Sequence, residues 1–272
     1  MPWYENRRGE RLWYEDDGAG FPVVMLHGWC MSSAVWKYQR TGLAGSLRIL
    51  TPDLRGHGRS KELSGYMDFD GFASDLADLL DHLKLSKIVL VGWSLGGQIA
   101  LKACAGLADR LAGLVLVSAT PSFTASEDFL YGLSSKEVSG MRLKVQRNIS
   151  RALEGFHTRL FADNELDGHP SASDIAQLLA SIPDPETVAA LDALDSLART
   201  DLRPQLASIT VPTVIMNGDQ DRICMPQASD YLTSHISGAD HSIFSRCGHM
   251  PFLTYHTRFN EELIRFTRSV CA

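Results

Sequence analysis

Six short apolar runs, each bounded by glycine, proline or polar residues, are the strongest constraint on the fold of this chain. They recur along most of its 272 residues, with helical patterns between them. Short runs of this kind are typical of strands that are covered on both faces, as in a parallel sheet between helices. The alternation therefore predicts a doubly wound, mostly parallel α/β domain. The predicted strands are residues 23–26, 47–50, 88–91, 114–117, 214–216 and 242–244, and the clearest predicted helices are residues 69–83, 97–107 and 257–270.

One region interrupts this alternation. Residues 121–202 contain helical patterns with glycine and proline interruptions, and no convincing strand. Because ligands of α/β sheets bind at the carboxyl ends of the strands, an insertion between the fourth and fifth predicted strands would cover that end. We therefore expect residues 1–120 and 203–272 to form the core. Residues 121–202 are expected to form a helical cap that is one structural unit with the core.

Composition and charge exclude several classes of protein. The chain has 26 basic and 32 acidic side chains, a net charge of −6, and no basic stretch of the kind that binds nucleic acids. The N-terminus lacks the apolar region of a signal peptide, and residues 88–101, the longest weakly charged stretch, fall short of a membrane span. We therefore expect a cytoplasmic protein that binds neither nucleic acid nor membrane. The 5 cysteines show no C-x-x-C spacing, which argues against a disulfide framework and a structural zinc site.

The sharpest local motif is Gly92-Trp93-Ser94-Leu95-Gly96, between a predicted strand and a helical pattern. This is the G-x-S-x-G motif in the strand–turn–helix context that it requires. Glycines on both sides of Ser94 leave room for a very tight turn that exposes the hydroxyl, and the following helix N-terminus favours developing negative charge. The alternative is a glycine-bounded turn with an idle serine. A phosphate-binding loop is disfavoured, because neither Gly-Lys-Ser/Thr nor G-x-G-x-x-G is present.

A nucleophilic serine needs a base and an acid that orients the base. In this architecture they follow in the order serine, acid, histidine. The loops after the last two predicted strands carry Asp219 and Asp221, and then His249. We expect His249 to act as general base and then general acid, with Asp221 as its orienting carboxylate. Asp219 is the competing acid, but an aspartate directly after a glycine readily bonds its own backbone.

The remaining part of a serine hydrolase site is the oxyanion hole. The strand ending at Leu26 is followed by His27-Gly28-Trp29, so backbone N–H groups lie at the same end of the sheet as Ser94. The amides of Trp29 and Leu95 are the expected pair of donors to a tetrahedral intermediate. The side chains of Trp29 and Trp93 are expected to line the acyl pocket. Such a site requires neither a metal ion nor an organic cofactor.

Several residues near these loops are assigned structural roles. His27 is expected to be a satisfied histidine in a turn. The loop Asp53–Ser60 is expected to be a shaped loop held by pairing between its aspartate and arginines. Cys30 and Cys247 flank the site, but neither lies on a strand-to-helix turn of the nucleophile type, and a free cysteine is commonly a small buried apolar residue.

Taken together, these motifs resemble the α/β-hydrolase superfamily over nearly the whole chain outside the insertion. Ser94 disfavours the haloalkane dehalogenase and epoxide hydrolase branches, which carry aspartate at the nucleophile position. The segments that carry the resemblance are His27-Gly28-Trp29, Asp53–Ser60, Gly92–Gly97, Asp221 and Gly248–Phe252.

Within the superfamily, the chain is similar to the biotin-pathway carboxylesterases. That resemblance implies a serine esterase that hydrolyses the methyl ester of pimeloyl-acyl carrier protein. The alternatives are a general carboxylesterase on short acyl or aryl esters, a perhydrolase or C–C bond hydrolase, and a catalytically silent receptor or binding protein on the same fold. The segments behind this similarity are His27-Gly28-Trp29, Gly92–Gly97, Leu116–Phe123 and Asp201-Leu202-Arg203.

That family binds its acidic carrier protein through arginines on the cap. Residues 134–160 carry a net charge of +4 in a chain of net charge −6, which could steer an acidic partner, although a solvated helix face explains it too. The resemblance implies substrate-binding roles for Arg151 and Phe156. Gly155 stands where the family has an arginine, and residues 162–168 are acidic. The basic residues of this segment are Lys136, Arg142, Lys144, Arg147, Arg151 and Arg159, and its acidic residues are Glu137 and Glu154.

Overall fold

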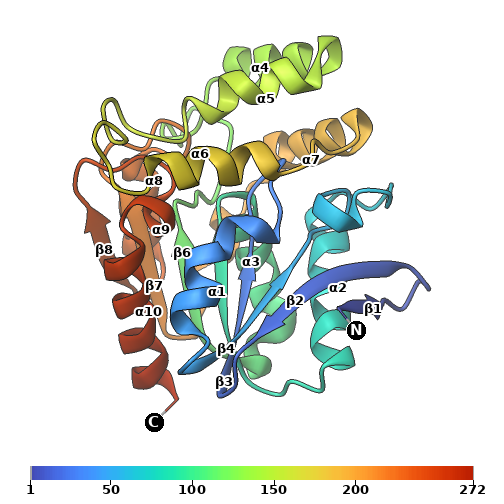
Figure 1. Ribbon diagram of the computed structural model, residues 1–272, viewed down its shortest axis with the longest axis vertical. Coiled ribbons are helices and arrows are strands. Elements are labelled where there is room, and N and C mark those ends of the chain that lie inside the picture. Colours follow the sequence, from blue (N-terminus) through green and yellow to red (C-terminus); the bar gives the residue numbers. More distant parts are fainter. Residues whose placement is uncertain (1, 272) are drawn as a thin grey trace.

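An eight-stranded sheet lies at the centre of the computed structural model, which describes residues 2–271 (Figure 1). The strand order is β1-β2-β4-β3-β5-β6-β7-β8, and the pairs from β4 to β8 are all parallel. The prediction of a mostly parallel α/β sheet is therefore confirmed. The strands are β1 (Trp3–Glu5), β2 (Arg11–Asp17), β3 (Phe21–Leu26), β4 (Leu47–Pro52), β5 (Ile88–Trp93), β6 (Leu111–Val117), β7 (Thr213–Gly218) and β8 (Asp240–Phe244).

The N-terminal strands β1 and β2 were not among the predicted strands. They are antiparallel to each other, and β2 pairs antiparallel with β4. In β2 only Leu12 and Tyr14 are buried, which is the alternating pattern of a strand with one face on the core. Strand β2 therefore lacks the continuous apolar run that marks the predicted strands.

Helices cover both faces of the sheet. Helices α1 and α10 pack together on one face, and α2 and α3 pack together on the other. Every residue of β5 is buried between these layers, as expected for a central parallel strand. The core helices are α1 (Lys37–Leu43), α2 (Phe69–His82), α3 (Leu95–Leu107), α8 (Pro226–His235), α9 (Pro251–Thr254) and α10 (His256–Val270).

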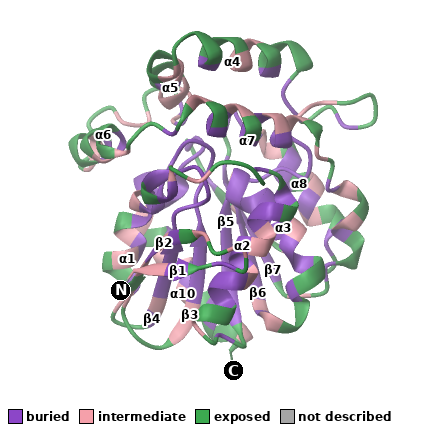
Figure 2. Ribbon diagram, turned by 90° about the vertical axis from the view of Figure 1, so that its right-hand side faces the viewer, coloured by how far each residue is buried: buried purple, intermediate pink, exposed green. Residues whose placement is uncertain are grey.

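The region between β6 and β7 folds into helices above the carboxyl ends of the strands (Figure 1). Its two ends lie together, because Leu202 N donates to Pro121 O over 2.8 Å. The outward faces of these helices are largely exposed, whereas the sheet below them is buried (Figure 2). The helices of this region are α4 (Ser135–Arg147), α5 (Ile149–His157), α6 (Ala172–Ser181) and α7 (Thr187–Arg199). Within residues 2–271, no helix is long and apolar enough to cross a bilayer.

Candidate active site

Ser94 occupies a strained turn between β5 and α3. Its backbone has φ 54° and ψ −115°, and its amide donates to Val117 O over 3.0 Å. Neighbouring glycines allow the turn to close: a Cβ on Gly92 would overlap the carbonyl of Gly96, and a Cβ on Gly96 would overlap the carbonyl of Leu26. A non-glycine residue at positive φ is uncommon and costs on the order of 1–3 kcal/mol, so the surrounding structure must hold it.

His249 and Asp221 form a buried pair at the same end of the sheet. His249 Nδ1 lies 2.6 Å from Asp221 Oδ2, and both side chains are almost completely buried. The other carboxylate oxygen accepts from the amides of Ile223 (2.8 Å) and Cys224 (3.1 Å), which fixes the carboxylate. Among residues 2–271, His249 Nε2 has no hydrogen-bond partner. An Nδ1–H donor to Asp221 leaves Nε2 as a free proton acceptor.

The three loops that carry these residues follow strands of one sheet. Ser94 follows β5, Asp221 follows β7 and His249 follows β8, so all three lie at strand carboxyl ends. Asp219 is exposed, and within residues 2–271 its side chain makes only one hydrogen bond, a long one of 3.4 Å from the amide of Cys247. The structure thus brings Asp221, and not Asp219, to His249.

The two amides expected to form an oxyanion hole lie beside Ser94. Leu95 is the first residue of α3, and the first amides of a helix have no intrahelical acceptor. The Trp29 amide also has no acceptor among residues 2–271. Trp29 follows Gly28, where a Cβ would lie 3.3 Å from the Cβ of Ser94. This arrangement leaves two amide donors close to the serine.

The two tryptophans of the predicted acyl pocket have different positions. Trp29 Nε1 donates to Ala190 O of α7 over 2.8 Å, and its ring meets Phe156 of α5 edge-on at 5.3 Å. Trp93 is buried below the histidine loop, where its Nε1 donates to His249 O over 2.9 Å. Trp93 therefore supports the histidine loop, and it is not among the residues that line the cavity next to Trp29.

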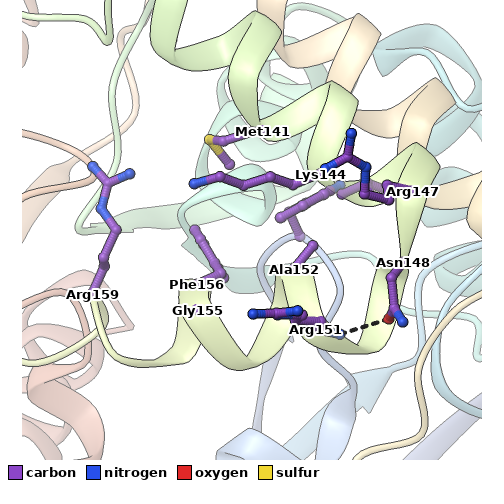
Figure 3. Close-up of a pocket in the computed structure, with 11 residues that line it drawn as sticks. Met141, Lys144, Arg147, Asn148, Arg151, Ala152, Gly155, Phe156 and Arg159 are labelled. Atoms are coloured by element: carbon purple, nitrogen blue, oxygen red, sulfur yellow. Dashed lines mark hydrogen bonds between the residues drawn. The ribbon is translucent and has the colours of Figure 1, made fainter.

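A cavity of about 390 Å³ lies against α4 and α5, and Trp29 is the core residue in its wall. Arg151 and Phe156, which the family resemblance assigned to substrate binding, both line it (Figure 3). Ser94 does not line this cavity, but Trp29 belongs to the loop that touches Ser94. The lining contains no acidic residue. The residues that line it are Trp29, Met141, Lys144, Val145, Arg147, Asn148, Arg151, Ala152, Gly155, Phe156 and Arg159.

The basic side chains of residues 134–160 differ in their partners. Arg142 pairs with Asp195 of α7 at 3.0 Å, and Arg159 donates to the carbonyl of Arg222 over 3.1 Å. Lys144, Arg147 and Arg151 are exposed and have no ion-pair partner among residues 2–271. These three unpaired side chains line the cavity, whereas Lys136, which is also exposed, does not.

The acidic residues 162–168 are partly used inside the protein. Asp163 pairs with Arg222, the neighbour of Asp221. Glu165 accepts a hydrogen bond from Gly248 N over 2.8 Å and another from the Thr254 hydroxyl over 2.7 Å. The sequence does not indicate this role of Glu165, because both of these contacts are with residues more than eighty positions away.

His27 and His57 are buried and neutral. His27 Nδ1 donates to Gly28 O over 2.8 Å, and its Nε2 accepts from Leu54 N over 3.0 Å. Burial lowers the pKa of His27 to about 4 and that of His57 to about 3. His27 is thus the satisfied histidine that the sequence predicted.

The loop Asp53–Ser60 is a shaped loop, but its charges pair differently from the prediction. Asp53 accepts from the amides of Ser33 (2.6 Å) and Arg59 (2.8 Å), and it does not pair with an arginine side chain. Arg55 is buried and pairs instead with Asp75 and Glu10. The prediction of an internal aspartate–arginine pair was wrong, because the buried carboxylate is satisfied by backbone amides.

The cysteines near the site are buried thiols. Burial, with the nearby charge of Asp184, raises the pKa of Cys30 well above its usual value. Burial and then the charge of Glu165 raise the pKa of Cys247. A thiol with a raised pKa is a poor nucleophile at neutral pH. Among residues 2–271, no three His, Cys, Asp or Glu side chains are grouped as metal ligands.

Several proteins with similar sequences are named as esterases. The family model for the alpha/beta hydrolase fold matches residues 22–254. A protein of Nitrosospira multiformis named pimeloyl-[acyl-carrier protein] methyl ester esterase is 31% identical over 94% of this chain and 98% of its own length. A second protein of that name, from Nitrosomonas europaea, is 32% identical over 90% of this chain and 95% of its own length.

Among solved structures, an esterase from Exiguobacterium antarcticum has a TM-score of 0.90 at 29% identity and covers 98% of both chains. The resemblance described from the sequence and the expected enzyme class, a carboxylic ester hydrolase, are both confirmed. Because the family model spans most of its length, this chain belongs to the alpha/beta hydrolase family.

Proposed function

We propose that the chain is a serine carboxylesterase that hydrolyses the methyl ester of a pimeloyl chain bound to acyl carrier protein. The observation that carries the hydrolytic part is the buried His249–Asp221 pair, whose Nε2 has no partner among residues 2–271, at the same end of the sheet as a serine held in a strained turn. In this proposal Ser94 is the nucleophile, His249 the base and Asp221 the carboxylate that orients it.

The reaction proceeds through an acyl-enzyme. Ser94 Oγ attacks the ester carbonyl while His249 Nε2 takes its proton, and the amides of Trp29 and Leu95 stabilise the oxyanion. His249 returns the proton to the departing methanol. Water then attacks the acyl-serine with His249 as base, which releases the free acid and restores the Ser94 hydroxyl.

Two observations support the carrier-bound substrate. Relatives aligned over nearly their whole length are named for this ester. The cavity beside Trp29 is also lined by four basic side chains and no acidic one, which suits the phosphate or carboxylates of an acidic carrier. Arg151 and Phe156 are proposed to contact this substrate. The proposal places the enzyme in the cytoplasm, where such carriers work.

The test is whether the purified protein hydrolyses pimeloyl-acyl carrier protein methyl ester, and the released methanol measures the reaction. Ser94→Ala should lose turnover and should not react with a fluorophosphonate label. Labelling of folded Ser94→Ala at the wild-type rate would identify a different nucleophile. No adduct in the wild-type protein would favour a silent receptor on this fold.

A general carboxylesterase is the second candidate. It is favoured by Gly155, which replaces a basic residue of the carrier-binding pattern, and by the esterase from Exiguobacterium antarcticum with the same fold. Rapid hydrolysis of p-nitrophenyl acetate together with no hydrolysis of the carrier-bound ester would establish this alternative.

A further inference from the structure

A carboxylate of the cap region holds the loop that carries His249. Glu165 Oε2 accepts from Gly248 N (2.8 Å) and from Ala162 N (2.7 Å). Its Oε1 accepts from the hydroxyl of Thr254 (2.7 Å). Glu165 thus contacts the chain on both sides of His249.

The backbone of the same segment also binds this loop. His249 N donates to Leu160 O over 2.7 Å. At Gly248, a Cβ would lie only 2.7 Å from both Leu160 O and Ala162 N. The glycine before the histidine therefore allows the cap segment to approach, and Glu165 then accepts the glycine amide.

The histidine loop has no regular secondary structure between β8 and α9. Its position therefore depends on packing in the core and on hydrogen bonds to neighbouring segments. Below the loop, Trp93 Nε1 donates to His249 O. Above it, Glu165 and Leu160 accept the two consecutive amides of Gly248 and His249. The imidazole is held between these contacts with Nδ1 on Asp221.

We propose that Glu165 is a positioning residue for His249, an inference that rests on the proposed hydrolytic function. Removing its carboxylate leaves the amides of Gly248 and Ala162 without this acceptor and leaves the Thr254 hydroxyl with its longer contact to Met250 O (3.5 Å), so the loop can shift. A misplacement of about 1 Å can cost roughly a hundredfold in rate, even when the changed residue does not touch the substrate. Proton transfer to His249 is the step affected.

The test uses the full-length protein with p-nitrophenyl acetate and a fluorophosphonate label. Glu165→Ala is expected to lower kcat and the labelling rate of Ser94 at least about tenfold, with KM changed less than about twofold. Glu165→Gln should recover most of the rate, because its amide oxygen can accept from Gly248 and Ala162 while its NH2 donates to Thr254 Oγ1. The low-field proton resonance of the His249–Asp221 hydrogen bond should weaken in Glu165→Ala and return in Glu165→Gln.

Asp167→Ala is the matched control, because Asp167 is exposed in the same acidic stretch and its side chain has no bond among residues 2–271. It should behave as wild type. Thr254→Val removes the 2.7 Å contact with Oε1, together with the longer contacts of the same hydroxyl to Met250 O (3.5 Å) and Cys247 Sγ (3.7 Å), and keeps the Gly248 contact of Glu165. It should give a smaller kcat loss with KM again changed less than about twofold, which keeps the test decisive if Glu165→Ala does not fold. Wild-type kcat in folded Glu165→Ala or in Thr254→Val, or an equal loss in Asp167→Ala, would overturn the proposal.

These readouts separate the positioning role from the proposed function. A wild-type protein that hydrolyses the model ester but not the carrier-bound ester disproves the substrate and leaves the Glu165 experiment intact. A wild-type protein without a labelled Ser94 disproves the hydrolytic mechanism itself.

Discussion

Ser94 holds a backbone conformation that most residues avoid, and its neighbours explain why it persists. Its carbonyl accepts from the amides of Gly97 (2.9 Å) and Gln98 (3.1 Å), and its own amide bonds Val117 on the adjacent strand. These hydrogen bonds hold the turn in place, and their stabilisation offsets the strain at Ser94. The glycines around Ser94 matter because β3, β5 and α3 meet there with no space for a side chain.

Gly96→Ala should therefore destabilise the protein. Its Cβ would overlap backbone atoms of Leu26 and His27, which cannot move without distorting the sheet. We expect a loss of about 1–3 kcal/mol in the free energy of unfolding, measured by urea denaturation. Gly155→Ala in helix α5 is the control, because no atom lies within 4 Å of its Cβ, and it should gain about 0.5–1 kcal/mol. Equal effects of the two substitutions would contradict this packing argument.

Asp221 and Asp219, the two aspartates after β7, allow a second comparison of a variant with a matched control. Asp221→Asn should lower kcat by about ten-thousandfold with little change in KM, because the amide can hold His249 in the wrong tautomer. Asp219→Asn should retain most activity, since Asp219 is exposed and does not reach His249. Steady-state kinetics with a soluble ester measure both variants. A larger loss in Asp219→Asn than in Asp221→Asn would reverse the assignment.

Sequence patterns predict those site residues that lie in a short motif or directly after a predicted strand. Ser94 lies in a five-residue motif, and His249 and Asp221 follow recognisable strands, so their proximity could be predicted before their catalytic roles are tested. Glu165 could not be predicted, because its partners Gly248 and Thr254 are 83 and 89 residues away. No spacing rule connects a turn of the cap region to the histidine loop.

At the level of elements, the sequence predicts the parallel strands and the helices that cover them. It does not predict the antiparallel strands β1 and β2 at the edge of the sheet. Strand β2 contains Trp13, Glu15 and Asp17 on its less buried side, which lowers its mean hydropathy. Its signal is alternation and not an apolar run. The helices of residues 121–202 posed a different problem, because their arrangement depends on contacts with one another and with the core.

The basic side chains that line the cavity at α4 and α5 lead to a prediction about the substrate. They are Lys144, Arg147, Arg151 and Arg159. Arg147→Glu should raise KM for the carrier-bound ester about tenfold, an effect that added salt reduces, because the interaction is a solvent-exposed attraction between opposite charges. Turnover of p-nitrophenyl acetate should not change. Lys136→Glu is the control, since Lys136 is exposed on α4 outside the cavity. An equal rise in KM in both variants would point to net charge and not to this cavity.

For the whole molecule, buried neutral histidines make stability depend on pH. His27 and His57 lie with ring centroids 5.4 Å apart beneath the Trp29 loop, and both side chains are fully buried. Burial lowers their pKa values to about 4 and about 3, against 6.5 for an exposed histidine. Below pH of about 6.5 the unfolded chain therefore binds protons that the folded chain refuses.

The contribution of these histidines to stability is complete above pH of about 6.5 and is lost as the pH falls towards 4. Glu10 adds to this only at lower pH, because its hydrogen bond with Arg55 lowers its pKa from 4.5 to about 2. The loss between pH of about 6 and 5 thus reports on histidines, at roughly 1 kcal/mol per pH unit for each fully buried one.

His57→Gln should flatten that slope. Urea denaturation of this variant between pH of about 7 and 5 should show a pH dependence smaller by about 1 kcal/mol per pH unit, even if its stability at pH 7 is lower. His235→Gln is the matched control, because His235 is exposed at the end of α8 and should leave the slope unchanged. If His57→Gln left the slope unchanged, His57 would have to be protonated in the folded protein. Burial and the neighbouring His27 disfavour that protonated form, because both lower the pKa of His57. The pH dependence of unfolding therefore tests the packing of the core beneath the site without reference to any substrate.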